Sequence, residues 1–204
     1  MTNSEHSDPV DAALALREQG RLEEALELLP AKGGASCDRT RIARGDCLLR
    51  LKRFKEALAC FELCESDAAR EPAMFGRAAA LQLLRRFDEA EEVYLRLLAL
   101  NPKAEEALSN LIAMSMEVFD LTRVLRYSRQ LFEINDQSQA ALQGLVLAAL
   151  ERHEYSDAAG YFARLMEHHA EITISREPDD GSIKYRVSRE AIELMNFHGR
   201  QEFP

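Results

Sequence analysis

A short apolar block with a small residue at its centre recurs five times along this chain. Successive centres are 32, 33, 34 and 34 positions apart. Each block follows a short turn and, before it, a stretch of helical length with apolar residues at helical spacing. Such a period is typical of stacked helix–turn–helix units, because one unit cannot bury its apolar face alone. We therefore expect an all-α array of about five units, centred on Ala25, Ala57, Ala90, Val124 and Ala158.

The distribution of small and large residues within the units resembles the tetratricopeptide repeat family. The third unit matches best: its small residues are Ala78 and Ala90, its large ones are Phe87 and Tyr94, and Pro102 closes it. A small residue at each crossing lets two antiparallel helices approach closely. The resemblance implies a right-handed superhelical solenoid whose concave wall is formed by the first helices of the units.

The resemblance extends over residues 8–170, and residues 1–7 are expected to form a flexible N-terminus. The first unit follows the pattern only from Gly20 onward. The fourth departs from it, because Ile112 and Val124 occupy places for small residues and Ser128 a place for a large one. The expected units are 8–36, 38–70, 72–102, 104–136 and 138–170, with a three-residue extension of the second unit before Pro72.

The helical pattern stops near residue 170. Residues 172–176 and 182–187 alternate with period two around the turn sequence 178–181, which predicts a β-hairpin. Ser188 is a suitable N-cap, and the apolar spacing of residues 191–197 predicts a closing helix. Residues 171–204 would then cap the last repeat. Alternatively, they would themselves be the working element, by strand addition or as a dimerisation arm.

The resemblance also implies that ligand contacts come from the first helices. Small residues with scattered apolar and amide groups suit an extended or helical peptide. Several of these side chains could instead serve only to pack the array. The clamp of Lys, Asn and Arg that binds acidic chaperone tails is missing, since Phe75 and Ala79 occupy two of its places. The candidate groove residues are Arg39, Ile42, Asp46, Arg50, Phe75, Ala79, Gln82, Asn110, Ala113, Met116, Glu117, Gln143 and Leu147.

Basic residues occupy the turns of the first three units, although the formal net charge of the chain is −9. That net charge argues against nucleic acid as a partner. Equivalent turns line one edge of a solenoid, so we predict a basic edge that recruits an acidic partner surface. Ordinary solvated turns are the alternative. The basic edge consists of Arg21, Lys52, Arg53, Arg85 and Arg86.

The chain lacks the common catalytic motifs, among them a glycine-rich phosphate loop, G-x-S-x-G and H-E-x-x-H. We therefore expect no enzyme and no cofactor. The cysteines are Cys37, Cys47, Cys60 and Cys64. Cys60 and Cys64 share a helical face and could offer two zinc ligands, but mid-helix positions are unusual for such sites, so packed thiols are expected and no metal is predicted.

These observations favour a non-catalytic adaptor or scaffold that binds a peptide or helical segment of a partner protein in its groove. Two alternatives stay open: a regulatory or substrate-presenting domain of an enzyme such as a glycosyl- or methyltransferase, and a bacterial secretion or assembly chaperone. The start of the chain has no export signal and no window is apolar enough to span a membrane, so we expect a cytoplasmic protein without membrane contact. A homodimer would form through the hairpin or a terminal repeat.

Overall fold

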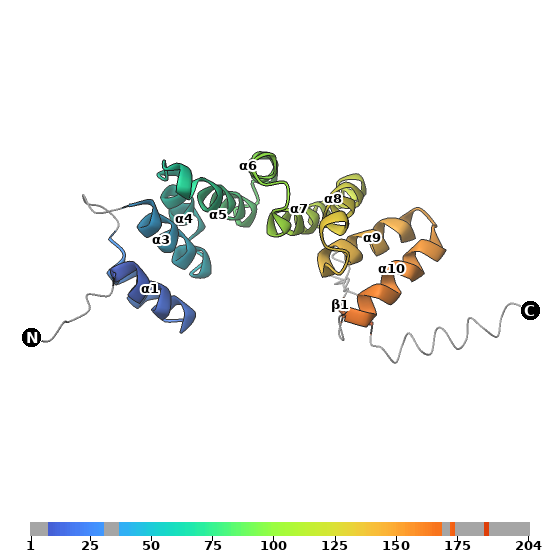
Figure 1. The fold of residues 1–204 in the computed structure, drawn as a ribbon, viewed down its shortest axis with the longest axis horizontal. Helices are drawn as coiled ribbons and strands as arrows, with labels where there is room; N and C mark the ends of the chain where they lie inside the picture. Colours follow the sequence, from blue (N-terminus) through green and yellow to red (C-terminus); the bar gives the residue numbers. More distant parts are fainter. Residues whose placement is uncertain (1–7, 31–36, 169–171, 174–185, 188–204) are drawn as a thin grey trace, which may run out of the picture. The chain divides into compact units, whose positions relative to one another are not determined.

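The computed structural model describes residues 8–30, 37–168, 172–173 and 186–187. The chain divides into two compact units, residues 1–107 and 108–204, and each is described by itself. Nearly all described residues are helical (Figure 1). Unit 1 contains α1 (Pro9–Glu18), α2 (Leu22–Leu28), α3 (Asp38–Arg50), α4 (Phe54–Glu62), the 3₁₀ turn η1 (Asp67–Ala69), α5 (Arg70–Leu83) and α6 (Phe87–Leu100). Helix α7 (Glu105–Glu117) begins at the boundary, and α8 (Leu121–Ile134), α9 (Gln139–Glu151) and α10 (Tyr155–His168) follow.

The same tight turn joins the two helices of every pair. Gly20, Lys52, Arg85, Phe119 and His153 occupy its central position, with φ between 57° and 76°. In each turn the next backbone N–H reaches back five residues to a carbonyl, as from Arg53 to Leu48 over 2.9 Å. This hydrogen bond satisfies a free carbonyl at the helix end, in the manner of a Schellman motif. Only one turn uses glycine, although the left-handed conformation costs other residues about 1–2 kcal/mol.

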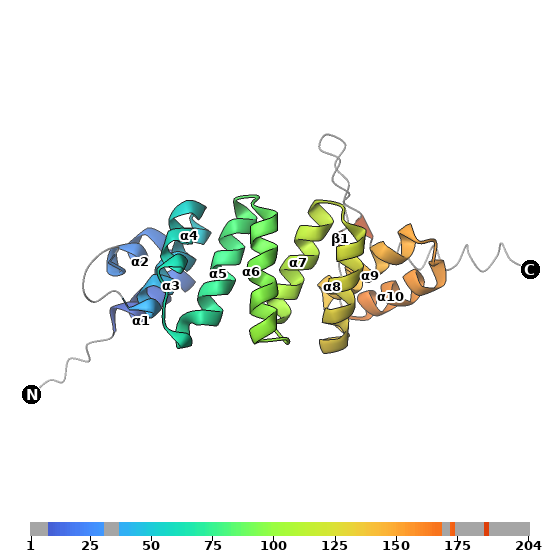
Figure 2. The same ribbon diagram turned by 90° about the horizontal axis from the view of Figure 1, so that it is seen from above.

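In unit 1, each helix packs against the next from α1 to α6, and α3 also contacts the first helices α1 and α5. Figure 2 shows α5 and α6 side by side. The predicted small residues lie at the crossings, since Ala25, Ala57, Ala78 and Ala90 are fully buried. The expected array of helix pairs is thus confirmed within this unit.

Two glycines of unit 1 pack against the ring of Phe61, which is 2% exposed. A Cβ atom added to Gly45 on α3 would lie 2.5 Å from this ring, and one added to Gly76 on α5 would lie 2.3 Å from it. Real Cβ atoms do not approach carbon so closely. The two glycines therefore let α3 and α5 enclose one aromatic side chain of α4.

Helix α4 is short, with 9 residues against 14 in α6. The segment after it is held to the start of α3 by Asp38, whose carboxylate accepts the backbone N–H groups of Glu65 at 3.2 Å and Ser66 at 2.7 Å. The hydrogen bonds, with that of Ser66 foremost, hold the pKa of Asp38 far below its usual range. The residues that extend the second predicted unit thus form a pinned loop and η1. Helix α5 already begins at Arg70, two residues before the predicted third unit.

In unit 2, α9 packs between α8 and α10. The largest fully buried side chains of unit 2 include Leu111, Tyr127, Leu131, Leu142 and Leu165. The fourth repeat, the one that departs most from the pattern, still forms a helix pair with the same turn, in which the N–H of Asp120 bonds to the carbonyl of Ser115 over 2.9 Å.

The predicted C-terminal hairpin lies mostly outside the described residues. Strands β1 (Ile172–Thr173) and β2 (Arg186–Val187) pair antiparallel, with Ile172 opposite Val187. Two residues a side do not establish a hairpin, and the predicted turn and closing helix fall on residues that the structure does not describe. The hairpin, the helix and the right-handed superhelix therefore stay predictions.

Candidate functional site

The first-helix face of α3 is occupied in part by charged side chains of α1. Arg39 forms ion pairs with Asp8 and Asp11. Arg50 lies 4.0 Å from Glu18. Two predicted groove residues are therefore engaged in joining the first repeat to the second, although both remain more than half exposed.

Asp46 shares this arrangement, because its carboxylate accepts a hydrogen bond from the Arg17 guanidinium at 3.1 Å. Burial raises the pKa of Asp46, and the nearby positive charges of Arg17 and Arg50 oppose that rise. Ile42 on the same helix packs against the core of the first two repeats. The α3 face thus serves mainly to hold α1 in place.

The face of α5 is different, since its side chains pair within their own repeat. The rings of Phe75 and Tyr94 meet edge to face with centroids 6.0 Å apart. The Tyr94 hydroxyl donates a hydrogen bond to Gln82 Oε1 at 3.2 Å. Phe75, Ala79 and Gln82 are half-buried and Leu83 is exposed. These four residues, the α5 patch, are held in place and accessible, as a peptide site requires.

In unit 2, the predicted residues lie on α7 and α9. Ala113 and Glu117 are exposed, whereas Asn110 and Met116 are half-buried. On α9, Gln143 and Leu147 are half-buried. The structure therefore places all six predicted residues of unit 2 at least partly at the surface.

Three arginines of the predicted basic edge are paired with glutamates three positions later. Arg53 Nε and Nη2 each donate to the Glu56 carboxylate at 2.7 Å, and Arg86 holds Glu89 in the same way. Arg21 and Glu24 form the third such pair. The hydrogen bonds raise the pKa of each arginine and lower that of each glutamate.

These pairs largely neutralise the edge. Of its other two members, Lys52 is exposed and the Arg85 guanidinium lies 4.8 Å from the centre of the Phe87 ring. The edge is thus a row of alternating charges rather than a continuous cationic strip.

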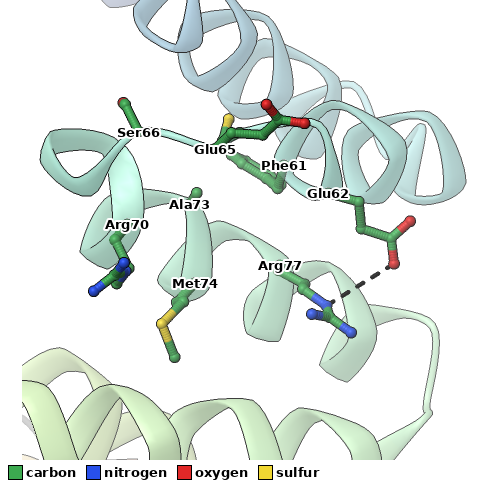
Figure 3. A pocket seen from close by; sticks show the side chains of 9 residues that line it. Phe61, Glu62, Glu65, Ser66, Arg70, Ala73, Met74 and Arg77 are labelled. Carbon is green, nitrogen blue, oxygen red and sulfur yellow. Dashed lines mark ion pairs between the residues drawn. The ribbon is translucent and has the colours of Figure 1, made fainter.

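A hollow of about 140 Å³ lies between α4 and α5, and sequence reasoning missed it. Figure 3 shows its lining side chains, among them Arg70, Met74 and Arg77 on α5 and Phe61 and Glu62 at the end of α4. The three-residue extension before Pro72 was its only sequence signal, since the loop that replaces the end of α4 lines it. We call it the α4–α5 cavity. It is lined by Phe61, Glu62, Cys64, Glu65, Ser66, Arg70, Ala73, Met74 and Arg77.

The prediction of packed thiols is wrong for Cys37, which is exposed at the start of α3. Its sulfur lies 3.4 Å from Thr40 Oγ1, and this hydrogen bond lowers the pKa of the thiol. Cys47 is buried, and burial raises the pKa of the half-buried Cys64 to about 11. Within the described ranges, no three His, Cys, Asp or Glu side chains are placed to share a metal ion.

Residues 39–66 and 72–104 match the family described as tetratricopeptide repeat. These two segments are tetratricopeptide repeats. The matched segments are the second and third repeats, which contain Phe61, the α4–α5 cavity and the α5 patch. No curated protein matches the chain in sequence.

Solved structures of MamA and YrrB have the same fold as this chain. A double mutant of MamA, MamA RS-1 ArsTM, has a TM-score of 0.68 at 18% identity and covers 79% of this chain and 95% of its own. MamA 41-end from Desulfovibrio magneticus RS-1 has a TM-score of 0.64 at 18% identity, covering 79% and 96%. YrrB, described as a TPR protein with an unusual peptide-binding site, has a TM-score of 0.57 at 16% identity, covering 95% and 90%. At these identities the likeness shows the fold alone.

Among the described residues, no helix is long and apolar enough to cross a membrane.

Proposed function

We propose that this protein is a non-catalytic interaction module that binds a peptide or helical segment of a partner protein on the first-helix face, with the α5 patch as its main anchor. Tetratricopeptide repeats are generally interaction modules of this kind. The observation that carries the proposal is the fixed geometry of Phe75 and Gln82. Both side chains are held by Tyr94 yet remain partly accessible.

The contrast between α3 and α5 supports this choice of anchor. A ligand over α3 would compete with the ion pairs of Arg39 and Asp46 to α1. A ligand over α5 meets an aromatic ring, a small Ala79 and an amide, which suit an apolar side chain and its backbone. YrrB, which has the same fold, is described as having a peptide-binding site, and this is consistent with a peptide ligand here.

The predicted residues of unit 2 form a second set of proposed ligand contacts within that unit. Met116 and Leu147 offer apolar contacts, and Gln143 offers an amide. A cytoplasmic location and a homodimer through a terminal repeat or the C-terminal hairpin belong to the same proposal.

The proposal can be tested by selecting ligands for the purified full chain from a random peptide library displayed on phage. The best peptide is then titrated against the wild type and Phe75→Ala by calorimetry. We expect Phe75→Ala to weaken binding at least tenfold, as for aromatic hot spots. Leu95→Ala is the matched control, because Leu95 is an apolar residue of α6 that is 37% exposed.

Thermal unfolding of each variant separates lost contacts from lost folding, since Phe75 also packs on Tyr94. Equal losses for Phe75→Ala and Leu95→Ala would place the site elsewhere. If the peptide bound the wild type and all first-helix variants alike but not a chain lacking residues 171–204, the C-terminal segment would be the site.

A further inference from the structure

The α4–α5 cavity lies away from the α5 patch and has no role in the proposed peptide site. Its walls come from the last residues of α4, the loop pinned by Asp38 and the first half of α5. Because α4 has 9 residues and α6 has 14, the cavity occupies a place that a longer second helix would cover.

The walls combine an apolar floor with a balanced polar rim. Phe61, Ala73 and Met74 supply the floor. The charged lining residues are Glu62, Glu65, Arg70 and Arg77, so their formal charges cancel, and Glu62 lies beside Arg77 (Figure 3). A ligand that carries a net charge gains little from such a rim. A neutral ligand with both hydrogen-bond donors and acceptors matches it well.

Arg77 indicates that the ligand supplies a hydrogen-bond acceptor. Its Nε is covered from solvent and donates no hydrogen bond, since Glu62 Oε1 lies 3.9 Å away, beyond hydrogen-bond length. A covered donor without an acceptor is unfavourable. The side chain as a whole is 41% exposed, so the guanidinium can turn toward an acceptor that enters the cavity.

We propose that the α4–α5 cavity binds a single Leu-, Met- or Phe-sized side chain from an extended segment of a partner protein, with a backbone carbonyl of that segment accepting a hydrogen bond from Arg77. The volume of about 140 Å³ supports this size, because a cavity of about 150 Å³ holds benzene. A peptide backbone is neutral and offers both N–H and C=O groups to the rim.

The test uses N-acetyl-leucine methylamide, which carries one apolar side chain between two peptide groups. It is titrated into ¹⁵N-labelled full-length protein, and the side-chain Nε–H signal of Arg77 is followed by NMR with the backbone signals of Ala73 and Met74. We expect these signals to shift and saturate, while the Nε–H signal of Arg96 on α6 stays in place. N-acetyl-glycine methylamide lacks the side chain and should cause no saturable shift.

Arg77→Lys keeps the charge but removes Nε–H, so it should weaken binding about tenfold, the value of one hydrogen bond from a charged donor. Arg96→Lys is the matched control. Ala73→Met, which fills the cavity, and Ser66→Leu, which blocks its rim, should each abolish the shifts. Equal shifts with the leucine and glycine probes, no shift with either, or unchanged binding by Arg77→Lys would overturn the proposal. Tighter binding of N-acetyl-leucine with a free carboxylate would refute a neutral backbone as the ligand. Phe75→Ala should leave these shifts intact, which separates this site from the α5 patch.

Discussion

The two units place a glycine against the neighbouring helix in chemically opposite ways. In unit 1, Gly45 and Gly76 receive the aromatic ring of Phe61. In unit 2, Gly144 on α9 receives the hydroxyl of Ser128 on α8, and a Cβ added there would lie 2.0 Å from that oxygen. The ring buries apolar surface, whereas the hydroxyl of Ser128 is buried without a hydrogen-bond partner.

The close packing of the helices therefore depends on the combined size of the facing side chains rather than on one residue type. A large residue between two glycines and a small residue against one glycine both give closely packed helices. The free energy differs, however. Burial of Phe61 is favourable in proportion to its apolar area, and burial of an unpaired hydroxyl is unfavourable.

Removal of the Phe61 ring should give the largest loss of stability. Phe61→Ala should lower the free energy of unfolding by about 3–5 kcal/mol, because the cavity left between α3, α4 and α5 cannot collapse fully. Urea unfolding of the full chain measures it. Leu63→Ala, two residues away and 58% exposed, should change the value by less than about 0.5 kcal/mol. Equal effects of the two variants would show that Phe61 does not join the helices.

Addition of one methyl group at a glycine tests the same contact from the other side. Gly76→Ala should cost about 1–3 kcal/mol, since the new Cβ would lie 2.3 Å from the ring of Phe61. Gly160→Ala on α10 has nothing within 4 Å and should stabilise the helix by about 0.5–1 kcal/mol. In a Phe61→Leu background the cost of Gly76→Ala should fall. Strictly additive free energies would contradict direct contact.

Substitution of two buried serines in unit 2 should change the free energy of unfolding in opposite directions. Ser128→Ala removes a hydroxyl without a hydrogen bond and should stabilise the protein by about 1 kcal/mol. Ser115→Ala is the control, because its hydroxyl donates to the Leu111 carbonyl at 2.6 Å, and its loss should destabilise by about 1 kcal/mol. Urea unfolding with the same slope in all variants would make the values comparable. A loss of stability in Ser128→Ala would mean that its hydroxyl is satisfied.

Much of this packing was predictable from the sequence, because the period of 32 to 34 residues fixes the helix pairs and their small crossing residues. Ala25, Ala57 and Ala90 lie fully buried where the pattern puts them. The turns were located as well, although four of five lack the glycine that usually marks them. At these turns the backbone hydrogen bonds and the packing of the neighbouring helices hold the central residue in the left-handed conformation, although its own conformational preference does not favour it.

The candidate site was less predictable, because it depends on pairings between distant residues. Arg39 and Asp46 occupy first-helix positions, but only the fold shows their ion pairs with α1. The pairs of Arg53 with Glu56 and Arg86 with Glu89 could have been found from their spacing. The α4–α5 cavity follows from the early end of α4, which no periodicity reveals.

The smallest expected effect concerns the ion pairs at the turns of unit 1, which are Arg21–Glu24, Arg53–Glu56 and Arg86–Glu89. The pKa of Glu24, Glu56 and Glu89 is lowered from 4.5 by hydrogen bonds from their arginines. Each pair therefore stabilises the fold above the ordinary pKa, and this contribution is lost as the pH falls through the lowered value. We expect the triple Glu→Gln variant to be slightly less stable than the wild type at neutral pH and equally stable in strong acid, by urea unfolding across the pH range.

Asp46 provides the internal contrast, because its pKa is raised from 3.8. Its contribution is present below the ordinary pKa and is lost as the pH rises through the folded value. Asp46→Asn should therefore change the pH profile in the direction opposite to that of the triple variant. In 1 M salt the difference at neutral pH between the triple variant and the wild type should shrink, since exposed pairs are screened. A difference that persisted unchanged in acid and in salt would show that the glutamates act through packing and not through their charge.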